Sequence, residues 1–181
     1  HQELSRIASA GVFKGGLADS SEIVTRLHTA HHLLLKALQI VLGPEVKQRG
    51  SNITAERLRM DFSYGSRMTE EQKKEVERIV NEKIAEDLPV IRTEMPIEEA
   101  EKLNAEREFG QKYPDVVSVY SIGPKSATQD DPKFKEAFSI EFCGGPHIRR
   151  TGELGGFEIM KEEAVSSGIR RIRANIVKRE S

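Results

Sequence analysis

The sequence predicts an α+β fold in which a mainly antiparallel sheet has helices packed on one side. Two observations lead to this class. Segments with the apolar periodicity of helices and shorter segments with the alternation of strands are mixed without a strict β–α–β order. In addition, the 181 residues include 37% hydrophobic side chains and show no internal repeat, which favours one substantial core.

Three helices are expected, and each has a recognisable boundary. The first has apolar side chains at every third or fourth position until a Gly-Pro pair ends the pattern. The second opens with a capping box at Thr69 and Gln72 and ends before a proline. The third is short and follows Pro96. The predicted helices cover residues 21–42, 69–87 and 97–103.

Six strands are expected where apolar and polar side chains alternate or where a short apolar run stands between turn signals. They cover residues 57–63, 90–94, 116–122, 138–142, 157–161 and 169–176. In the first of them Arg59 and Asp61 alternate with the apolar face, so they can face either a cleft or solvent. The polar segment 123–132 is predicted to be a loop long enough to be mobile.

The chain is interpreted as one domain with a short lead-in. Residues 1–21 are polar and contain a glycine pair, whereas residues 22–181 show no convincing domain boundary. The chain begins at His1 without a methionine, so we expect a fragment of a longer protein or a processed form.

The composition limits the classes of partner and compartment. The net charge of −1 gives no global basic field for nucleic acid. Basic residues do gather after His147, where they could meet phosphate or form a solvated surface. A single cysteine excludes an internal disulfide and is typical of a reducing compartment. Since no apolar run could span a membrane and no secretory signal opens the chain, a cytoplasmic location is expected.

Two pairs of potential metal ligands share one spacing. His28 and His32 lie four residues apart on the first predicted helix, so both can point to one ion. Cys143 follows a predicted strand, and the two glycines after it permit a turn that brings His147 beside it. Three imidazoles and one thiolate are a complete tetrahedral set for zinc. The sequence therefore predicts a zinc site that joins the first helix to a late strand.

Other interpretations of these residues stay open. Two histidines on an apolar helix can simply be packed or hydrogen-bonded, and a fold without metal is an alternative. The metalloprotease motif HExxH is absent, because Thr29 takes the position of the general-base glutamate. His31 is one position away from the ligand face and is expected to be a neighbour of the site.

The chain contains several longer motifs in order from Leu27 to Ala174. They are HTAHHLL, GSNITAERLRMDFS, MTEEQKKEVERIVNEKI, SIEFCGGPHIRRTGELGGFEI and SGIRRIRA. These motifs resemble the editing domain of alanyl-tRNA synthetase, which belongs to the threonyl and alanyl-tRNA synthetase second additional domain family. Free-standing AlaX-type editing proteins are related to this family. The lead-in also resembles the segment that precedes this domain in the synthetase.

The resemblance implies an aminoacyl-tRNA ester hydrolase. It would remove serine or glycine mischarged on tRNA(Ala) and spare alanyl-tRNA, with mischarged tRNA and the other domains of an ATP-binding parent ligase as partners. It implies that zinc is held by His28, His32, Cys143 and His147. It also implies that Gln48 lines the editing pocket and that Thr29 contributes a hydroxyl. Thr29, Gln48 and Cys143 are thus the expected catalytic residues.

Two positions depart from the family pattern. The alanine synthetases commonly have CGGTH, whereas this chain has CGGPH with Pro146, as in the related C-x-G-P-H of the threonine enzymes. His31 stands where threonine is frequent. Removal of serine from tRNA(Thr) therefore stays an alternative, beside a non-catalytic zinc-stapled module that binds tRNA. The sequence also leaves open whether zinc orients the substrate or activates the attacking water.

Overall fold

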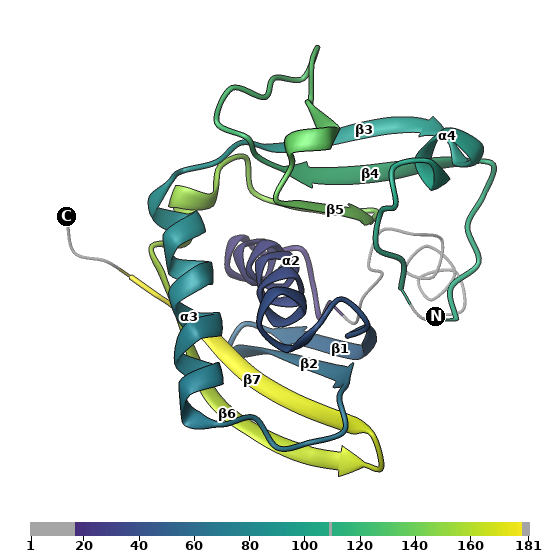
Figure 1. The fold of residues 1–181 in the computed structure, drawn as a ribbon. Coiled ribbons are helices and arrows are strands. Elements are labelled where there is room, and N and C mark those ends of the chain that lie inside the picture. Colours follow the sequence, from purple (N-terminus) through teal and green to yellow (C-terminus); the bar gives the residue numbers. More distant parts are fainter. Residues whose placement is uncertain (1–16, 109, 179–181) are drawn as a thin grey trace.

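Figure 1 shows the computed structural model of the chain, which describes residues 17–108 and 110–178. Helices and strands follow one another irregularly, as in α+β proteins. In chain order the elements are α2 (Glu22–Leu42), β1 (Gln48–Thr54), β2 (Arg57–Ser63), α3 (Glu70–Ala85), β3 (Val90–Pro96), α4 (Ile97–Glu101), β4 (Val116–Ile122), η2 (Phe134–Glu136), β5 (Ser139–Phe142), η3 (Thr151–Leu154), β6 (Gly156–Ser166) and β7 (Ile169–Val177).

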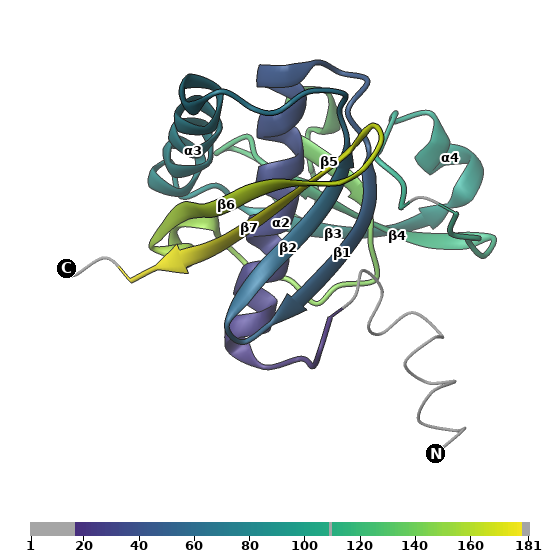
Figure 2. The ribbon, with the colours of Figure 1, turned by 90° about the horizontal axis from the view of Figure 1, so that it is seen from below.

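The strands form two antiparallel sheets on opposite sides of α2. One sheet has the strand order β1-β2-β7-β6, and the other has the order β3-β4-β5. Helix α2 runs between them, and α3 packs beside α2 and against β6 (Figure 1). In the view from below, the four-stranded sheet lies in front of α2 (Figure 2). Both long helices therefore cover the same face of the four-stranded sheet.

Helix α2 is the centre of the core. It begins after Ser21, whose hydroxyl caps the first turn by accepting a hydrogen bond from the N–H of Val24. Nearly all its side chains from Val24 to Gln39 are buried, which is the pattern of a helix covered on more than one side. On the four-stranded sheet, the inward side chains Leu58, Met60 and Phe62 of β2 are fully buried in the same cluster.

The predicted α+β class, with antiparallel strands and helices on one face of the larger sheet, is confirmed. The capping box at the start of α3 forms with both of its hydrogen bonds, between Thr69 and Gln72. Strand β1 is an element that apolar alternation does not indicate, because its sequence QRGSNIT is polar and it lies at the edge of the sheet. The division into two sheets is also new, since alternation identifies strands but not their partners.

The described residues test the lead-in only in part and do not test the mobility of the predicted loop. Residues 1–16 of the predicted lead-in lie outside the described residues, while Leu17 is buried and bridges Ile53 of β1. The mobility of the loop at 123–132 stays a prediction. Within the described part of the chain, no helix combines the length and apolar character needed to cross a membrane.

Candidate metal centre

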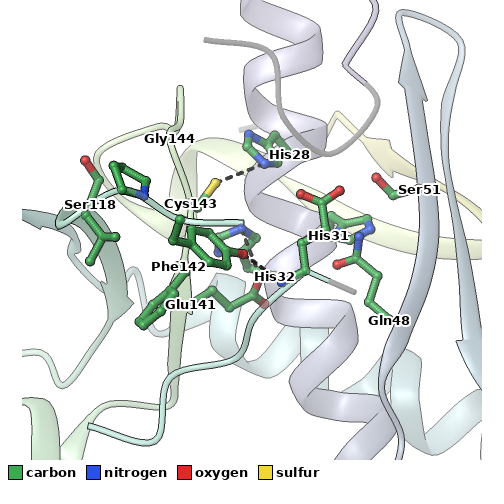
Figure 3. A pocket seen from close by; sticks show the side chains of 14 residues that line it. His28, His31, His32, Gln48, Ser51, Ser118, Glu141, Phe142, Cys143 and Gly144 are labelled. Carbon is green, nitrogen blue, oxygen red and sulfur yellow. Dashed lines mark hydrogen bonds and ion pairs between the residues drawn. The ribbon is translucent and has the colours of Figure 1, made fainter. Parts of the chain in front are cut away.

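Helix α2 carries three histidines into the interior. His28 and His32 are one turn apart, and His31 lies between them on a neighbouring face of the helix. Their exposed fractions are only 4%, 2% and 3%. In Figure 3 all three side chains project from α2 toward the space between β1 and β5. The burial of three imidazoles in one helix requires polar partners or an ion on the facing elements.

The segment after β5 supplies the facing groups. Cys143 directly follows β5, and its N–H donates to the carbonyl of Ser118, which fixes its position beside β4. The chain then turns at Gly145, which has a positive φ of 77°. A Cβ at this position would also collide with the hydroxyl of Tyr120, so the turn requires glycine. This turn returns His147 to α2.

The four predicted metal ligands come together. One ligand atom from each of His28, His32, Cys143 and His147 lies within 4.8 Å of all the others. We call these residues the ligand group. The sulfur of Cys143 is 3.4 Å from Nε2 of His28 and 3.3 Å from Nε2 of His147. Zinc bonds of about 2.0 to 2.3 Å at tetrahedral angles imply ligand separations of about 3.3 to 3.7 Å, so these distances fit a shared ion.

Hydrogen bonds at the far side of two imidazole rings fix the ligand nitrogens. Nδ1 of His28 donates to the carbonyl oxygen of Pro146 at 2.9 Å, which leaves the Nε2 lone pair directed toward the sulfur. Nδ1 of His147 lies 2.9 Å from Oγ1 of Thr29. That hydroxyl donates to the carbonyl of Thr25 and accepts from the N–H of Ile148. Its remaining lone pair therefore accepts from Nδ1 of His147, as metal-binding histidines usually require.

The histidines of the ligand group are held neutral. Burial lowers the pKa of His28 to about 4, against a smaller opposite effect of its hydrogen bond to Pro146. Burial, followed by the neighbouring histidines, lowers the pKa of His32 and of His147 well below the usual value. Since metal ions bind neutral imidazole, the group has the protonation state of a metal site near neutral pH.

Glu141 is a buried acid that contacts the ligand group. Its Oε2 lies 3.3 Å from Nε2 of His32, while Nδ1 of His32 is buried and has no hydrogen-bond partner among the described residues. Such an orphaned nitrogen is one that a metal ion would satisfy. Burial raises the pKa of Glu141 well above its usual range, and the carboxyl groups of Glu106 and Glu108 add to this. A carboxyl group on a metal-binding histidine orients its ring.

A cavity of about 70 Å³ opens beside the ligand group. It lies over α2 between strand β1 of one sheet and strands β4 and β5 of the other (Figure 3). The loop before β4 closes part of it. Three members of the ligand group line it, His28, His32 and Cys143. The other side chains with polar groups that line it are those of His31, Gln48, Ser51, Glu108, Tyr113, Ser118 and Glu141.

The other predicted site residues differ in their placement. Gln48 lines the cavity from the first position of β1 and is 8% exposed. Thr29 is completely buried and contacts His147, so its hydroxyl supports a ligand and does not line the cavity. His31 lines the cavity as a neighbour of the ligands. The catalytic roles of Thr29, Gln48 and Cys143 stay predictions.

Sequence reasoning missed Glu141, although a signal was present. In an extended strand, residues two positions apart point to the same face. Glu141 therefore shares with Cys143 the face of β5 that meets α2, while Phe142 packs into a separate apolar cluster on the other face. An acid two positions before a candidate ligand is thus a candidate partner of the metal site.

Comparison with known proteins gives one consistent family. Residues 117–173 match the threonyl and alanyl tRNA synthetase second additional domain. The chain is 60% identical over 174 residues to an alanine–tRNA ligase of Treponema denticola, which covers 96% of this chain and 27% of that protein. The alanine–tRNA ligase of Borrelia hermsii is 52% identical over 98% of this chain and 28% of the relative. That of Lysinibacillus sphaericus is 42% identical over 86% of this chain and 16% of the relative.

The chain thus spans little more than a quarter of the Treponema denticola and Borrelia hermsii relatives, at 27% and 28% of their lengths. The match includes both halves of the ligand group, because it extends over nearly the whole chain. The family match and these high identities agree with the resemblance seen in the motifs. The chain belongs to the alanyl-tRNA synthetase family, as a domain that includes the second additional domain shared with the threonyl enzymes.

Proposed function

We propose that the chain hydrolyses the ester that joins serine or glycine to tRNA(Ala), as the proofreading domain of an alanine–tRNA ligase. The observation that carries this proposal is the ligand group at the wall of a small polar cavity. The names of the relatives supply the substrate class, since ligases of this kind form aminoacyl-tRNA. Residues 22–181 would form the hydrolytic domain, with residues 1–21 as its lead-in from the parent ligase in the cytoplasm.

The donor set supports zinc as the metal. Three neutral imidazoles and a thiolate are typical zinc ligands, whereas magnesium and calcium prefer oxygen. When bound, zinc supplies a localised positive charge that can polarise the ester or orient the amino acid. In this proposal Cys143 acts as a ligand at the reaction site. Thr29 holds the ring of His147, and Glu141 holds that of His32, so both are positioning residues.

Selection for serine needs a group that binds its hydroxyl. An apolar pocket distinguishes a side chain with an added hydroxyl from one without it by only about a hundredfold. Gln48 brings an amide into the cavity at the edge of β1, and it can both donate to and accept from that hydroxyl. With alanine in place of serine this amide would lose a partner.

The decisive experiment is deacylation of seryl-tRNA(Ala) by this chain with zinc supplied. We expect serine to be released faster than the spontaneous rate and faster than alanine from alanyl-tRNA(Ala). Seryl-tRNA(Thr) is the second control, since faster hydrolysis of that substrate would transfer the proposal to threonine proofreading. Binding of tRNA without hydrolysis of any ester would contradict the enzymatic proposal and favour a non-catalytic tRNA-binding module.

A further inference from the structure

The four-stranded sheet has a charged face on the side away from α2. On β2, Leu58 and Met60 are fully buried toward the helix, so Arg57 and Arg59 point outward. Figure 2 looks onto this outer face, and no described helix or strand lies over it. The sequence left the direction of Arg59 open between a cleft and solvent. The structure directs it to the outer face, on the opposite side of the sheet from the cavity.

Three cations stand side by side across this face. Arg59 of β2 is opposite Arg173 of β7, and Arg173 is opposite Lys161 of β6. We call these three residues the cationic row. Neighbouring strands are about 4.8 Å apart, and like charges directly opposite each other destabilise a sheet. The row therefore has a cost in stability that an anionic partner would remove.

Among the described residues, the outer face carries three acidic side chains on its strands, Asp61, Glu158 and Glu163, and five cations, since Arg57 and Arg171 lie there beside the row. Glu163 is shared, because it pairs with both Arg173 and Lys161. Asp61 is paired with Arg171, which donates two hydrogen bonds of 2.7 and 3.0 Å to its carboxylate. Arg59 is half-buried and makes no hydrogen bond or ion pair with the described residues. Its Nε is covered and without a partner, whereas its two terminal nitrogens are not among the buried unpaired atoms, so these two are the donors that a ligand from outside can reach.

A second observation indicates excess positive charge here. The pKa of Arg57 is lowered, first by burial and then by the charges of Arg59 and Arg173. The whole chain has a net charge of −1, so this excess is local. A local row of arginine and lysine with spare donors matches the phosphate oxygens of a nucleic-acid backbone, which arginine binds through two parallel hydrogen bonds.

We propose that the cationic row binds the sugar–phosphate backbone of tRNA. The inference rests on the proposed function, because tRNA carries the substrate ester in that function. Strand β1 lies between the cationic row and the cavity. Asn52 lies opposite Arg59 at the end of the row, and the adjacent Ser51 lines the cavity on the other face of the same strand. An RNA that lies across the outer face can therefore pass the edge strand β1 and place its aminoacylated end in the cavity.

The test measures binding of uncharged tRNA(Ala) to the chain by fluorescence anisotropy over a range of salt concentrations. The test variant combines Arg59→Gln with Lys161→Gln. The control combines Arg78→Gln on α3 with Lys125→Gln in the loop after β4, so it loses the same charge elsewhere. Each lost phosphate contact should reduce the slope of log affinity against log salt by about 1, so the test variant should lose about 2. Near 0.1 M salt its affinity should fall about tenfold or more.

The readout separates this inference from the proposed function, since uncharged tRNA is not hydrolysed. A chain that binds tRNA through the row and deacylates nothing would contradict the proofreading proposal alone. Equal affinities and slopes for the wild type and the test variant would overturn the docking site, as would an equal loss in the control. Absence of tRNA binding by the wild type would also overturn it, and an acidic protein surface would then be the partner to seek.

Discussion

Helix α2 contacts two sheets through interfaces of opposite character. Toward the four-stranded sheet it meets apolar side chains such as Met60 and Phe62, which are fully buried. Toward the three-stranded sheet its histidines meet Glu141 and Cys143. The first interface is held by burial of apolar surface, which needs no ligand. The second buries polar and ionisable groups, which is costly unless each group has a partner. One interface therefore maintains the fold, while the other brings together four side chains that could hold a metal ion.

The largest effect is expected from Cys143→Ala at the polar interface. The sulfur contacts both His28 and His147, and its loss removes the one anionic ligand of the group, which binds zinc more strongly than a neutral imidazole. We expect bound zinc to be lost and deacylation of seryl-tRNA(Ala) to fall to the spontaneous rate. Elemental analysis and the deacylation assay measure the two outcomes. A chelator should produce the same loss in the wild type, and added zinc should reverse it.

Ser139→Ala is the matched control for that change. Ser139 lies on the same face of β5 and is buried, with 5% of its surface exposed, but it is not part of the ligand group. Its removal should preserve both zinc and activity. Full activity of Cys143→Ala in the absence of bound metal would show that the polar interface does not depend on an ion.

The second effect belongs to the apolar interface. Phe62→Ala empties a fully buried site, and such changes lower the free energy of unfolding by about 3 to 5 kcal/mol. Denaturant unfolding followed by circular dichroism measures the loss. The folded fraction should still bind zinc, because the ligand group lies on the other side of α2. Val177→Ala is the control at an exposed apolar position of the same sheet and should change stability by about 0.5 kcal/mol or less.

The apolar interface could be predicted from the sequence in large part. Helix α2 and strand β2 have regular apolar periodicity, and burial of these side chains follows directly from it. The capping box places the start of α3 for a similar local reason. Strand β1 was not predicted, because an edge strand with a polar sequence has no such pattern. Its place in the sheet depends on pairing with β2, which is a property of the tertiary structure.

At the polar interface the sequence predicted only which four side chains come together. Spacing within each pair identifies His28 with His32 and Cys143 with His147, and the chain has no other cysteine to compete. The contacts that support the ligands join residues far apart in sequence, such as Thr29 with His147. No local pattern encodes them. The second sheet, which brings β5 against α2, is likewise a matter of strand pairing that alternation does not specify.

The smallest effect tests whether a supporting contact contributes to the metal site. Glu141→Gln keeps the size of the side chain and an acceptor oxygen near His32, but it removes the ionisable carboxyl group. Loss of such a partner typically weakens metal binding by about 10- to 100-fold, and the retained oxygen places this change near tenfold. Competition with a chromophoric chelator measures the affinity for zinc, and excess zinc should restore deacylation.

Glu136→Gln, at an exposed position in η2, is the control for this change and should leave zinc affinity unaltered. An unchanged affinity in Glu141→Gln would mean that the buried acid only fills space between α2 and β5. A tenfold loss that zinc reverses would mean that the polar interface is organised beyond its four ligands. In that case the burial of a carboxyl group with a raised pKa is explained by its work on His32, because nothing in the packing of an apolar core requires an acid there.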